Sequence, residues 1–279
     1  AQGYLVRHLG RSAKPRATFP CYAWDPSKGS IDESALEGVS VIINLAGAPI
    51  AERWTPSYRS EILRSRVDGT LLLWKTVHEQ KIPLEKYISA SAVGYYPNSL
   101  DQEFSEDAKP GSDFLSQVCV EWETAAKRFE QLDIPTYIMR IGIVLSTEGG
   151  ALPKMAQPVK FGAGAALGSG KQWMPWIHID DLAEMFAFAL HSSNLEPGVY
   201  NAVGPKSATN KELTQAIAKV LKRPLFLPAI PTFVLKLMLG DMAETVLASN
   251  KASAKKIIAA GFSHRHPQLV PALEDLYQR

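Results

Sequence analysis

The chain has 279 residues, 46% of them hydrophobic, which is enough to bury a full core as one large domain or two unequal ones. Its 30 Lys and Arg residues nearly balance its 28 Asp and Glu residues, so the overall charge gives no reason to expect nucleic acid or an anionic membrane as a partner. Charge interrupts the apolar stretches, for example at Lys236, and we identify no transmembrane span, signal peptide or lipidation motif.

The two cysteines, Cys21 and Cys119, lie far apart and lack the spacing of metal ligands. We expect them to be reduced and structural, and we expect no metal site. These features together predict a cytoplasmic protein.

Short apolar runs alternate with amphipathic stretches, and this pattern predicts an α/β fold with a parallel, doubly wound sheet of Rossmann type. The clearest helix begins at Thr55-Pro56, an N-cap followed by proline, and is expected to end near Gln80. Strands are expected at 4–9, 18–24, 39–45, 86–91, 134–145 and 199–202, and further helices at 113–132, at 181–191 and from the capping box formed by Thr209 and Glu212.

The N-terminal part of this pattern lacks the first strand and the glycine-rich turn of a nucleotide-binding unit. The glycine-rich turn GxGxxG, which binds dinucleotide phosphates in such sheets, does not occur in the 279 residues. The segments up to Gly47 have the pattern of the second half of a nucleotide-binding unit. We therefore expect roughly 20–30 further residues, about one strand–turn–helix, before Ala1 in the native protein, and poor dinucleotide binding by a protein that truly begins there.

Composition changes at Gly149, where a glycine-rich region begins. We expect residues 1–205 to form a Rossmann-like cofactor domain, with 149–175 contributing to a substrate lobe. Residues 206–279, with several proline-marked helix starts, are expected to form a small, mainly helical C-terminal lobe.

The stretch 86–96 is the most informative part of the chain. It reads as a buried strand that ends on small hydroxyl residues and two tyrosines. Because the carboxyl ends of parallel strands form the ligand crevice of a doubly wound sheet, Ser91, Tyr95 and Tyr96 are the candidate catalytic residues. The alternatives are a cap at the strand end for Ser91 and locally satisfied, buried phenols for the tyrosines.

Seven short motifs occur in this order along the chain: Asn44-Leu45-Ala46-Gly47, Arg53-Trp54-Thr55, Ser65-Arg66-Val67, the run Ser89 to Tyr96, Trp122-Glu123, Gly149-Gly150 and the run Trp176 to Asp181. Together they resemble the atypical branch of the extended short-chain dehydrogenase/reductases, the sugar-nucleotide-epimerase-like "epimerase family", and residues 224–273 resemble the small C-terminal domain of that branch. The resemblance implies a domain that binds NADP(H), with a C-terminal lobe closing over a substrate.

Arg11 favours NADP(H) over NAD(H). It follows a predicted strand at the position where an acidic residue would hold an NAD ribose hydroxyl, and no Asp or Glu lies between Tyr4 and Ala23. The alternative for Arg11 is an ordinary surface arginine. For Leu45, Ala46 and Gly47 the alternative is close packing alone. For Glu61 and Arg66, whose cofactor role is implied only by the family's motif, the alternative is a solvated helix face. The cofactor-binding candidates are Gly10, Arg11, Leu45, Ala46, Gly47, Glu61, Arg66 and Val144.

The chain departs from the family at the acid–base couple. An active short-chain dehydrogenase needs Tyr-x-x-x-Lys on a helix, yet none of the tyrosines has a lysine four residues later. Depending on register, Phe114 or Leu115 stands where the tyrosine belongs, and Val118 or Cys119 where the lysine belongs.

Several residues are candidates for a substrate pocket. Trp54, Trp173 and Trp176 would form apolar pocket walls or, alternatively, a seam between the lobes. Arg140 would be costly to bury unpaired, so it pairs with a carboxylate or meets an anionic ligand. We expect His178 to be a structural, hydrogen-bonded histidine rather than a base, and Glu106 to face water.

Two functional hypotheses remain open. The first is an NADP(H)-dependent oxidoreductase or epimerase acting on an unknown small molecule through an unconventional acid–base group. The second is a non-catalytic NADP(H)-binding regulator that docks a partner through its C-terminal lobe. A pocket lined by Ser91, Tyr95 and Trp176 would support the first, and side chains that fill this space would support the second.

Overall fold

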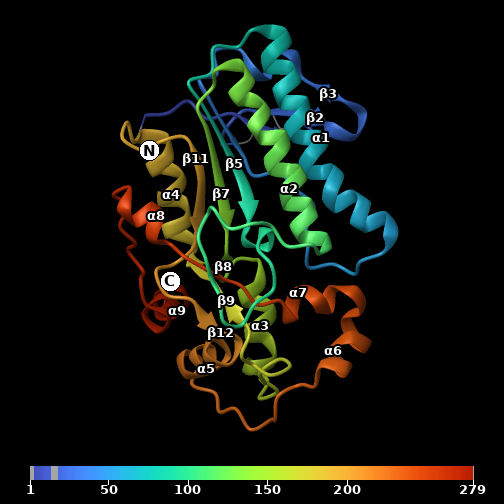
Figure 1. Ribbon diagram of the computed structural model, residues 1–279, viewed down its shortest axis with the longest axis vertical. Helices are drawn as coiled ribbons and strands as arrows, with labels where there is room; N and C mark the ends of the chain where they lie inside the picture. The colour runs from blue at the N-terminus through green and yellow to red at the C-terminus, as the bar shows by residue number, and fades with distance from the viewer. Residues whose placement is uncertain (1–2, 14–17, 279) are drawn as a thin grey trace.

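The computed structural model describes residues 3–13 and 18–278. Its centre is a four-stranded parallel sheet with the strand order β11-β7-β5-β4 (Figure 1). The four strands are Gly198–Ala202 (β11), Thr136–Ile141 (β7), Lys86–Ala92 (β5) and Val41–Asn44 (β4).

Helices cover both faces of this sheet. On one face lie α1 (Pro56–Gln80) and α2 (Phe114–Ala126), which is extended by the 3-10 helix η4 (Lys127–Leu132). On the other face lie α4 (Ile179–His191) and α8 (Lys255–Ala259) (Figure 1). Successive side chains of β5 point to opposite faces of the sheet and pack against the helices there. The predicted α/β fold with a Rossmann-type, doubly wound sheet is thus confirmed.

The expected helix boundaries follow from their caps. The Thr55 hydroxyl accepts the backbone N–H of Tyr58 at 3.1 Å, and α1 begins at Pro56 as predicted. Asp113 caps α2 in the same way through the N–H of Ser116 at 2.9 Å. The C-terminal end of α4 is closed by Lys86, whose Nζ donates to the carbonyl oxygens of Ala189, Leu190 and Ser192 at 2.9–3.0 Å.

A separate three-stranded sheet forms the N-terminal part: β1 (His8–Gly10), β2 (Cys21–Asp25) and β3 (Ser30–Ile31). The strand predicted at 4–9 is shorter and later than expected, because only His8–Gly10 pairs with β2. An apolar groove of about 380 Å³ separates β1 from β4. Leu9, Trp24 and Ile42 are among the residues that line it.

The long strand predicted at 134–145 is broken at Gly142. A Cβ atom at this position would clash with the carbonyl oxygen of Pro175, so only glycine allows the two segments to approach. Beyond the break, β8 (Ile143–Leu145) pairs in parallel with β10 (Trp176–His178). The chain then passes from the sheet towards the C-terminal lobe.

A second hydrophobic core lies among helices of the C-terminal half of the chain. Helices α3 (Ala151–Lys160), α5 (Asn210–Val220) and α9 (Leu269–Gln278) pack there around Trp176 and Leu213. The predicted capping box of α5 is present, with Thr209 and Glu212 bonded reciprocally.

No helix of residues 3–13 and 18–278 combines the length and the apolar character needed to cross a membrane. The remaining elements are β6 (Glu103–Phe104), β9 (Trp173–Met174), β12 (Ala208–Thr209), β13 (Lys251–Ala252), α6 (Thr232–Leu239), α7 (Ala243–Leu247) and the 3-10 helices η1 (Pro26–Lys28), η2 (Glu33–Leu36), η3 (Val93–Tyr95) and η5 (Gly240–Met242).

Candidate cofactor and substrate sites

The turn after β4 is held by Asn44. Its amide nitrogen donates to the hydroxyls of Thr70 and Tyr87, both at 3.0 Å, and its amide oxygen accepts the N–H of Ala46 at 3.1 Å. These bonds fix the turn Leu45-Ala46-Gly47 at the carboxyl end of the strand. Leu45 is 62% exposed there, so it presents an apolar side chain at the surface.

Arg66 of α1 reaches under this turn. It is 8% exposed, and its guanidinium donates to the carbonyl oxygens of Ile62 at 2.9 Å and Ala48 at 3.1 Å. A Cβ atom at Gly47 would lie 2.8 Å from the guanidinium carbon, so a larger residue would force the two apart. Burial lowers the pKa of Arg66, and among the described residues it has no carboxylate within ion-pair distance.

The surroundings of Arg66 fit a bound ligand with negative charge. Its guanidinium carbon lies 5.2 Å from the ring centre of Trp122, whose buried Nε1 has no hydrogen-bond partner among the described residues. A buried cation without a carboxylate and an orphaned donor are both costly in a folded protein. A dinucleotide would supply acceptor oxygens for such groups.

The other cofactor candidates lie on three further parts of the chain: β1 and the turn after it, α1, and β8. Gly10 ends β1 and Arg11 follows it, exposed. Glu61 is exposed on α1, and Val144 is half-buried in β8, opposite Ile177 of β10. Gly47 and Arg66 are therefore in direct contact, whereas Arg11, Glu61 and Val144 lie on separate elements.

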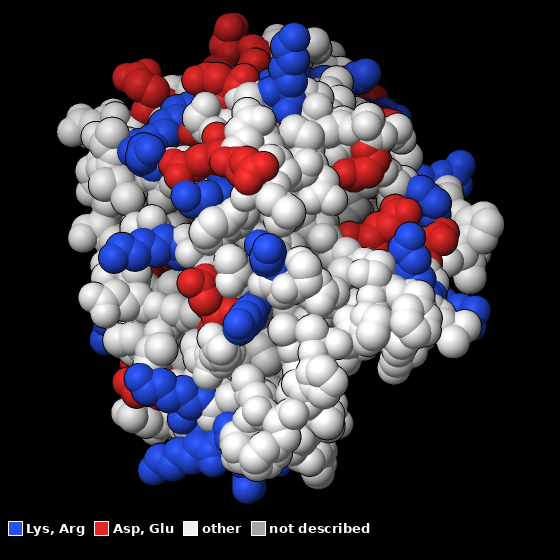
Figure 2. All heavy atoms as spheres, turned by 60° about the horizontal axis from the view of Figure 1, so that its bottom comes forward, with Lys and Arg blue, Asp and Glu red and all other residues white. Residues whose placement is uncertain are grey.

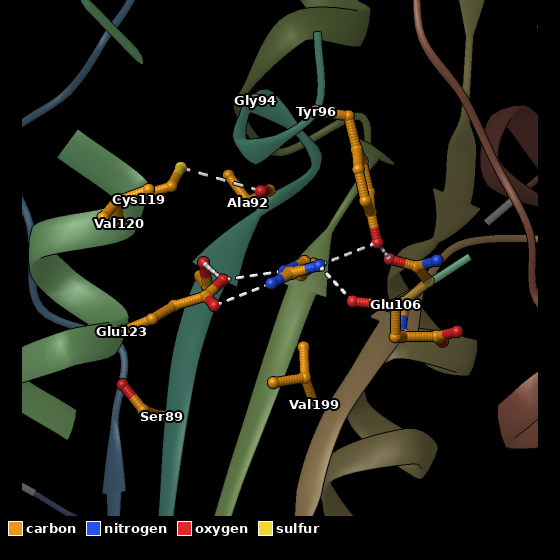
Figure 3. A network of polar contacts seen from close by, with 12 residues as sticks. Ser89, Ala92, Gly94, Tyr96, Glu106, Cys119, Val120, Glu123 and Val199 are labelled. Carbon is orange, nitrogen blue, oxygen red and sulfur yellow. Dashed lines mark hydrogen bonds and ion pairs between the residues drawn. The ribbon is translucent and has the colours of Figure 1, made fainter. Parts of the chain in front are cut away.

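Ser91 belongs to a buried ion-pair network (Figure 3). Its hydroxyl donates to Oε1 of Glu123 at 2.7 Å. The guanidinium of Arg140 donates to both carboxylate oxygens of Glu123, each at 2.8 Å. Burial alone would lower the pKa of Arg140, but the hydrogen bonds and charge of Glu123 raise it above its ordinary value. Arg140 thus pairs with a carboxylate, the first of the two outcomes predicted for it.

Tyr96 lies on the other side of the same guanidinium (Figure 3). Its hydroxyl accepts a hydrogen bond from Arg140 at 3.1 Å and donates to Oδ1 of Asn201 at 2.6 Å. Burial raises the pKa of Tyr96 to about 12, so the phenol is a weak acid there. Tyr95 is half-buried, and the guanidinium carbon of Arg140 lies 3.4 Å from its ring centre. Ser91 and Tyr96 therefore have the local bonds named as alternatives to a catalytic role.

Glu106 is buried rather than facing water, contrary to the sequence prediction. Its carboxylate accepts the N–H of Asn201 at 2.8 Å, and its carbonyl oxygen accepts a hydrogen bond from Arg140 at 3.0 Å. The loop that carries Glu106 folds back over the sheet, and β6 in this loop pairs with β13 from the C-terminal part of the chain. Such a contact between distant segments has no signal in the local sequence.

The register of α2 identifies the residues that face the end of β5. A Cβ atom built at Gly94 would lie 3.5 Å from Leu115 Cβ and 4.0 Å from Cys119 Sγ. Phe114 instead packs edge-on against Trp54, at 5.4 Å between ring centres. Of the two pairs that the sequence offers for the Tyr and Lys positions, Leu115 and Cys119 are the one that faces the end of β5. Burial and the nearby carboxylate of Glu123 raise the pKa of the Cys119 thiol to about 12.

A cleft of about 570 Å³ opens beside these residues. One wall comes from the end of β5 and the start of α2, and the opposite wall from α6, α7 and Asn250. Figure 2 shows a hollow on the right of this face, with acidic side chains at its edge. The volume of the cleft is typical of small-molecule sites. The lining includes Trp54, Gly94, Tyr96, Asp113, Phe114, Leu115, Lys236, Glu244, Thr245, Leu247 and Asn250.

Of the predicted pocket residues, Trp54 lines this cleft. Trp176 and His178 do not, because they are buried at 1% and 0% exposure between the sheet and the C-terminal helices. Arg140 is sequestered by Glu123. Trp173 is half-buried, and its Nε1 donates to the carbonyl oxygen of Leu100 at 2.7 Å. Ser91, at 2% exposure, and Tyr95 do not line this cleft either.

His178 is hydrogen-bonded, in line with its predicted structural role. Its Nδ1 accepts the N–H of Asp180 at 3.1 Å, and its Nε2 lies 3.3 Å from a carboxylate oxygen of Asp275. These three residues and His266 form a group whose potential metal-ligating atoms lie within 4.8 Å of one another. However, the rings of His178 and His266 are stacked at 3.8 Å and 22°, so their in-plane lone pairs do not converge on one point.

Comparison with known proteins decides the family. Residues 6–203 match the model of the "NAD dependent epimerase/dehydratase family", and residues 230–276 match a "Domain of unknown function (DUF1731)". The chain belongs to the NAD dependent epimerase/dehydratase family. It is 37% identical to epimerase family protein YfhF of Bacillus subtilis over 278 residues, which cover 99% of this chain and 90% of that protein.

Other members of the epimerase family are equally similar. Mouse epimerase family protein SDR39U1 is 38% identical over 281 residues, covering 99% of this chain and 92% of that protein. The crystal structure of human epimerase family protein SDR39U1 (isoform 2) with NADPH has a TM-score of 0.85 at 31% identity, and covers 99% of this chain and 92% of that chain. The recognised resemblance to the "epimerase family" with its small C-terminal domain is thus confirmed.

Proposed function

We propose that this epimerase-family protein binds NADP(H) and acts as an oxidoreductase or epimerase on a small molecule held in the cleft between β5–α2 and α6–α7. The observation that carries the proposal is the position of the cleft. It begins at Gly94 and Leu115, beside the positions where a short-chain dehydrogenase carries its acid–base couple. Ligands of open α/β sheets bind at these carboxyl ends of the strands.

Two arginines support NADP(H) as the cofactor. Exposed Arg11 follows β1, where it would accommodate a 2′-phosphate. Buried Arg66, next to Gly47, would bind an electronegative part of the dinucleotide. The human relative in complex with NADPH supports the same choice. A bound nicotinamide would supply or accept hydride, and the residues of this chain would hold and orient both molecules.

The acid–base group would come from the cleft lining rather than from Ser91 or Tyr96. The hydroxyl of Ser91 already donates a hydrogen bond to Glu123, and Tyr96 is buried and weakly acidic. Asp113, Glu244 and Lys236 are the charged groups of the lining, and each type of side chain can exchange a proton.

A non-catalytic NADP(H)-binding regulator is the second candidate. It is favoured by Leu115 and Cys119, since an apolar side chain and a neutral, buried thiol cannot replace a phenol and an ammonium group. In that case the cleft would hold an effector or part of a partner, and cofactor binding would not be followed by turnover.

The test begins with calorimetric titration of the full-length protein with NADPH, NADP, NADH and NAD. We expect NADPH to bind more tightly than NADH, and Arg11→Ala to remove the preference. A substrate screen by NADPH oxidation follows, with Leu247→Trp as a variant that fills the cleft. Turnover that survives Ser91→Ala but not Leu247→Trp supports the proposal. NADPH binding without turnover across the screen supports the regulator, and no dinucleotide binding contradicts both.

A further inference from the structure

Resting on the proposed function, we infer that the cleft selects an uncharged or cationic substrate rich in hydrogen-bond donors, and that it rejects nucleoside diphosphates. The charges of the lining, the anionic partners of nearby cations and the acceptor that faces the cleft support this specificity.

The lining carries more negative than positive charge. Asp113 at the start of α2 and Glu244 on α7 are carboxylates, whereas Lys236 on α6 is the only Lys or Arg among the described residues that line the cleft. A diphosphate carries at least two negative charges and is normally bound by several positive or N–H donors. In this cleft a diphosphate would face two negatively charged side chains, Asp113 and Glu244, and one positively charged side chain, Lys236.

Two other sources of positive potential near the cleft already have an anionic partner. The guanidinium carbon of Arg59 lies 4.3 Å from the ring centre of Phe114, but its Nη1 pairs with Asp241 at 3.6 Å. The N-terminus of α2 would attract an anion, but the Asp113 carboxylate accepts the N–H of Ser116 at 2.9 Å and occupies that end of the helix.

The wall formed by α6 and α7 offers a hydrogen-bond acceptor to the cleft. The exposed carboxylate of Glu244 lines it. Asn250 and Thr245 line the same wall, but Oδ1 of Asn250 and Oγ1 of Thr245 are inaccessible to water and so do not face the open cleft. A carboxylate accepts only, and Glu244 therefore needs a hydroxyl or amino group on the ligand.

The opposite wall is apolar and aromatic. Trp54, Phe114 and Leu115 face the cleft there, and such surfaces pack against the C–H faces of a ring. Acceptors on one side and apolar rings on the other are suited to a polyhydroxylated or amino-substituted ring without phosphate. This is a narrower class than the cofactor fold alone would suggest.

The experiment compares ligands that share one ring and differ in charge. NADPH-loaded, full-length protein is titrated by calorimetry and thermal shift with glucosamine, methyl glucoside, glucose 1-phosphate and UDP-glucose. We expect glucosamine and methyl glucoside to bind and the two phosphates to bind at least about tenfold more weakly. Tighter binding of UDP-glucose or glucose 1-phosphate overturns the inference, and so does a failure of all four probes to bind.

A charge-reversal variant tests the cause. Glu244 is exposed and forms no ion pair with the described residues, so Glu244→Lys should fold normally and shift the ratio of phosphate to glucosamine affinity by about tenfold in favour of the phosphates. Glu130→Lys, at an exposed position on η4, is the matched control and should leave the ratio unchanged. An unchanged ratio in Glu244→Lys overturns the inference. Loss of NADPH binding in the unsubstituted protein would instead contradict the proposed function.

Discussion

The guanidinium of Arg140 donates to both carboxylate oxygens of Glu123 at 2.8 Å, and both side chains are nearly inaccessible to water, at 2% and 3% exposure. The pair links β7 to α2 and engages the hydroxyl of Ser91 on β5. The network lies at the carboxyl end of β5, where the sequence predicts the catalytic residues Ser91 and Tyr96, and its members satisfy one another's hydrogen bonds.

Breaking this pair should destabilise the fold strongly. Arg140→Met leaves the Glu123 carboxylate buried without a cation, and we expect the free energy of unfolding to fall by about 3–5 kcal/mol in chemical denaturation. The double substitution Arg140→Met, Glu123→Leu should recover part of that loss. Lys75→Met, which breaks an exposed pair with Glu79 at 3.8 Å, is the control and should change stability by less than about 1 kcal/mol. Equal losses of stability in Arg140→Met and Lys75→Met would contradict this account.

Tyr96 should make stability fall at high pH. Its pKa is raised to about 12 in the folded protein, against about 10 in the unfolded chain. The folded state therefore holds the proton more tightly, and its stabilising effect is complete below pH 10 and is lost as pH rises from about 10 to 12. Denaturation at a series of pH values should show a smaller loss over this window in Tyr96→Phe. An identical pH profile in both proteins would show that the phenol ionises normally.

The two cysteines should differ in reactivity. Cys119 is 4% exposed with a pKa raised to about 12, whereas Cys21 is only partly buried. Because the thiolate is the reactive form, we expect an aromatic disulfide reagent to modify Cys21 in the native protein and Cys119 only after unfolding. Cys21→Ser should then have no rapidly reacting thiol. Rapid modification of that variant would indicate that Cys119 is accessible and ionised.

Much of the fold could be predicted from local sequence. The N-cap at Thr55 and the capping box at Thr209 set helix starts correctly, since each needs only neighbouring residues. The apolar run at 134–145 predicts one continuous strand, because nothing in the run itself marks the break at Gly142. That break depends on Pro175, which is distant in sequence.

The site was less predictable for the same reason. Trp176 and His178 belong to the densest aromatic cluster of the sequence, but they are buried by helices from the C-terminal lobe. Conversely, Glu244 and Asn250 have no distinguishing motif, and they line the cleft only because α6 and α7 fold against the start of α2. Residue type identified the candidates, whereas the packing of distant segments decided which of them face a ligand.

Arg66 provides the most direct test of cofactor binding. Arg66→Met keeps the volume and removes a buried charge, so we expect the stability of the ligand-free protein to change by no more than about 1 kcal/mol. NADPH affinity, measured by calorimetry on the full-length protein, should fall by about tenfold or more, because a charge-assisted hydrogen bond is lost. Arg64→Met, at an exposed position on the same helix, should leave the affinity unchanged. Unaltered NADPH binding by Arg66→Met would contradict the account, since the buried cation would then serve only the turn after β4.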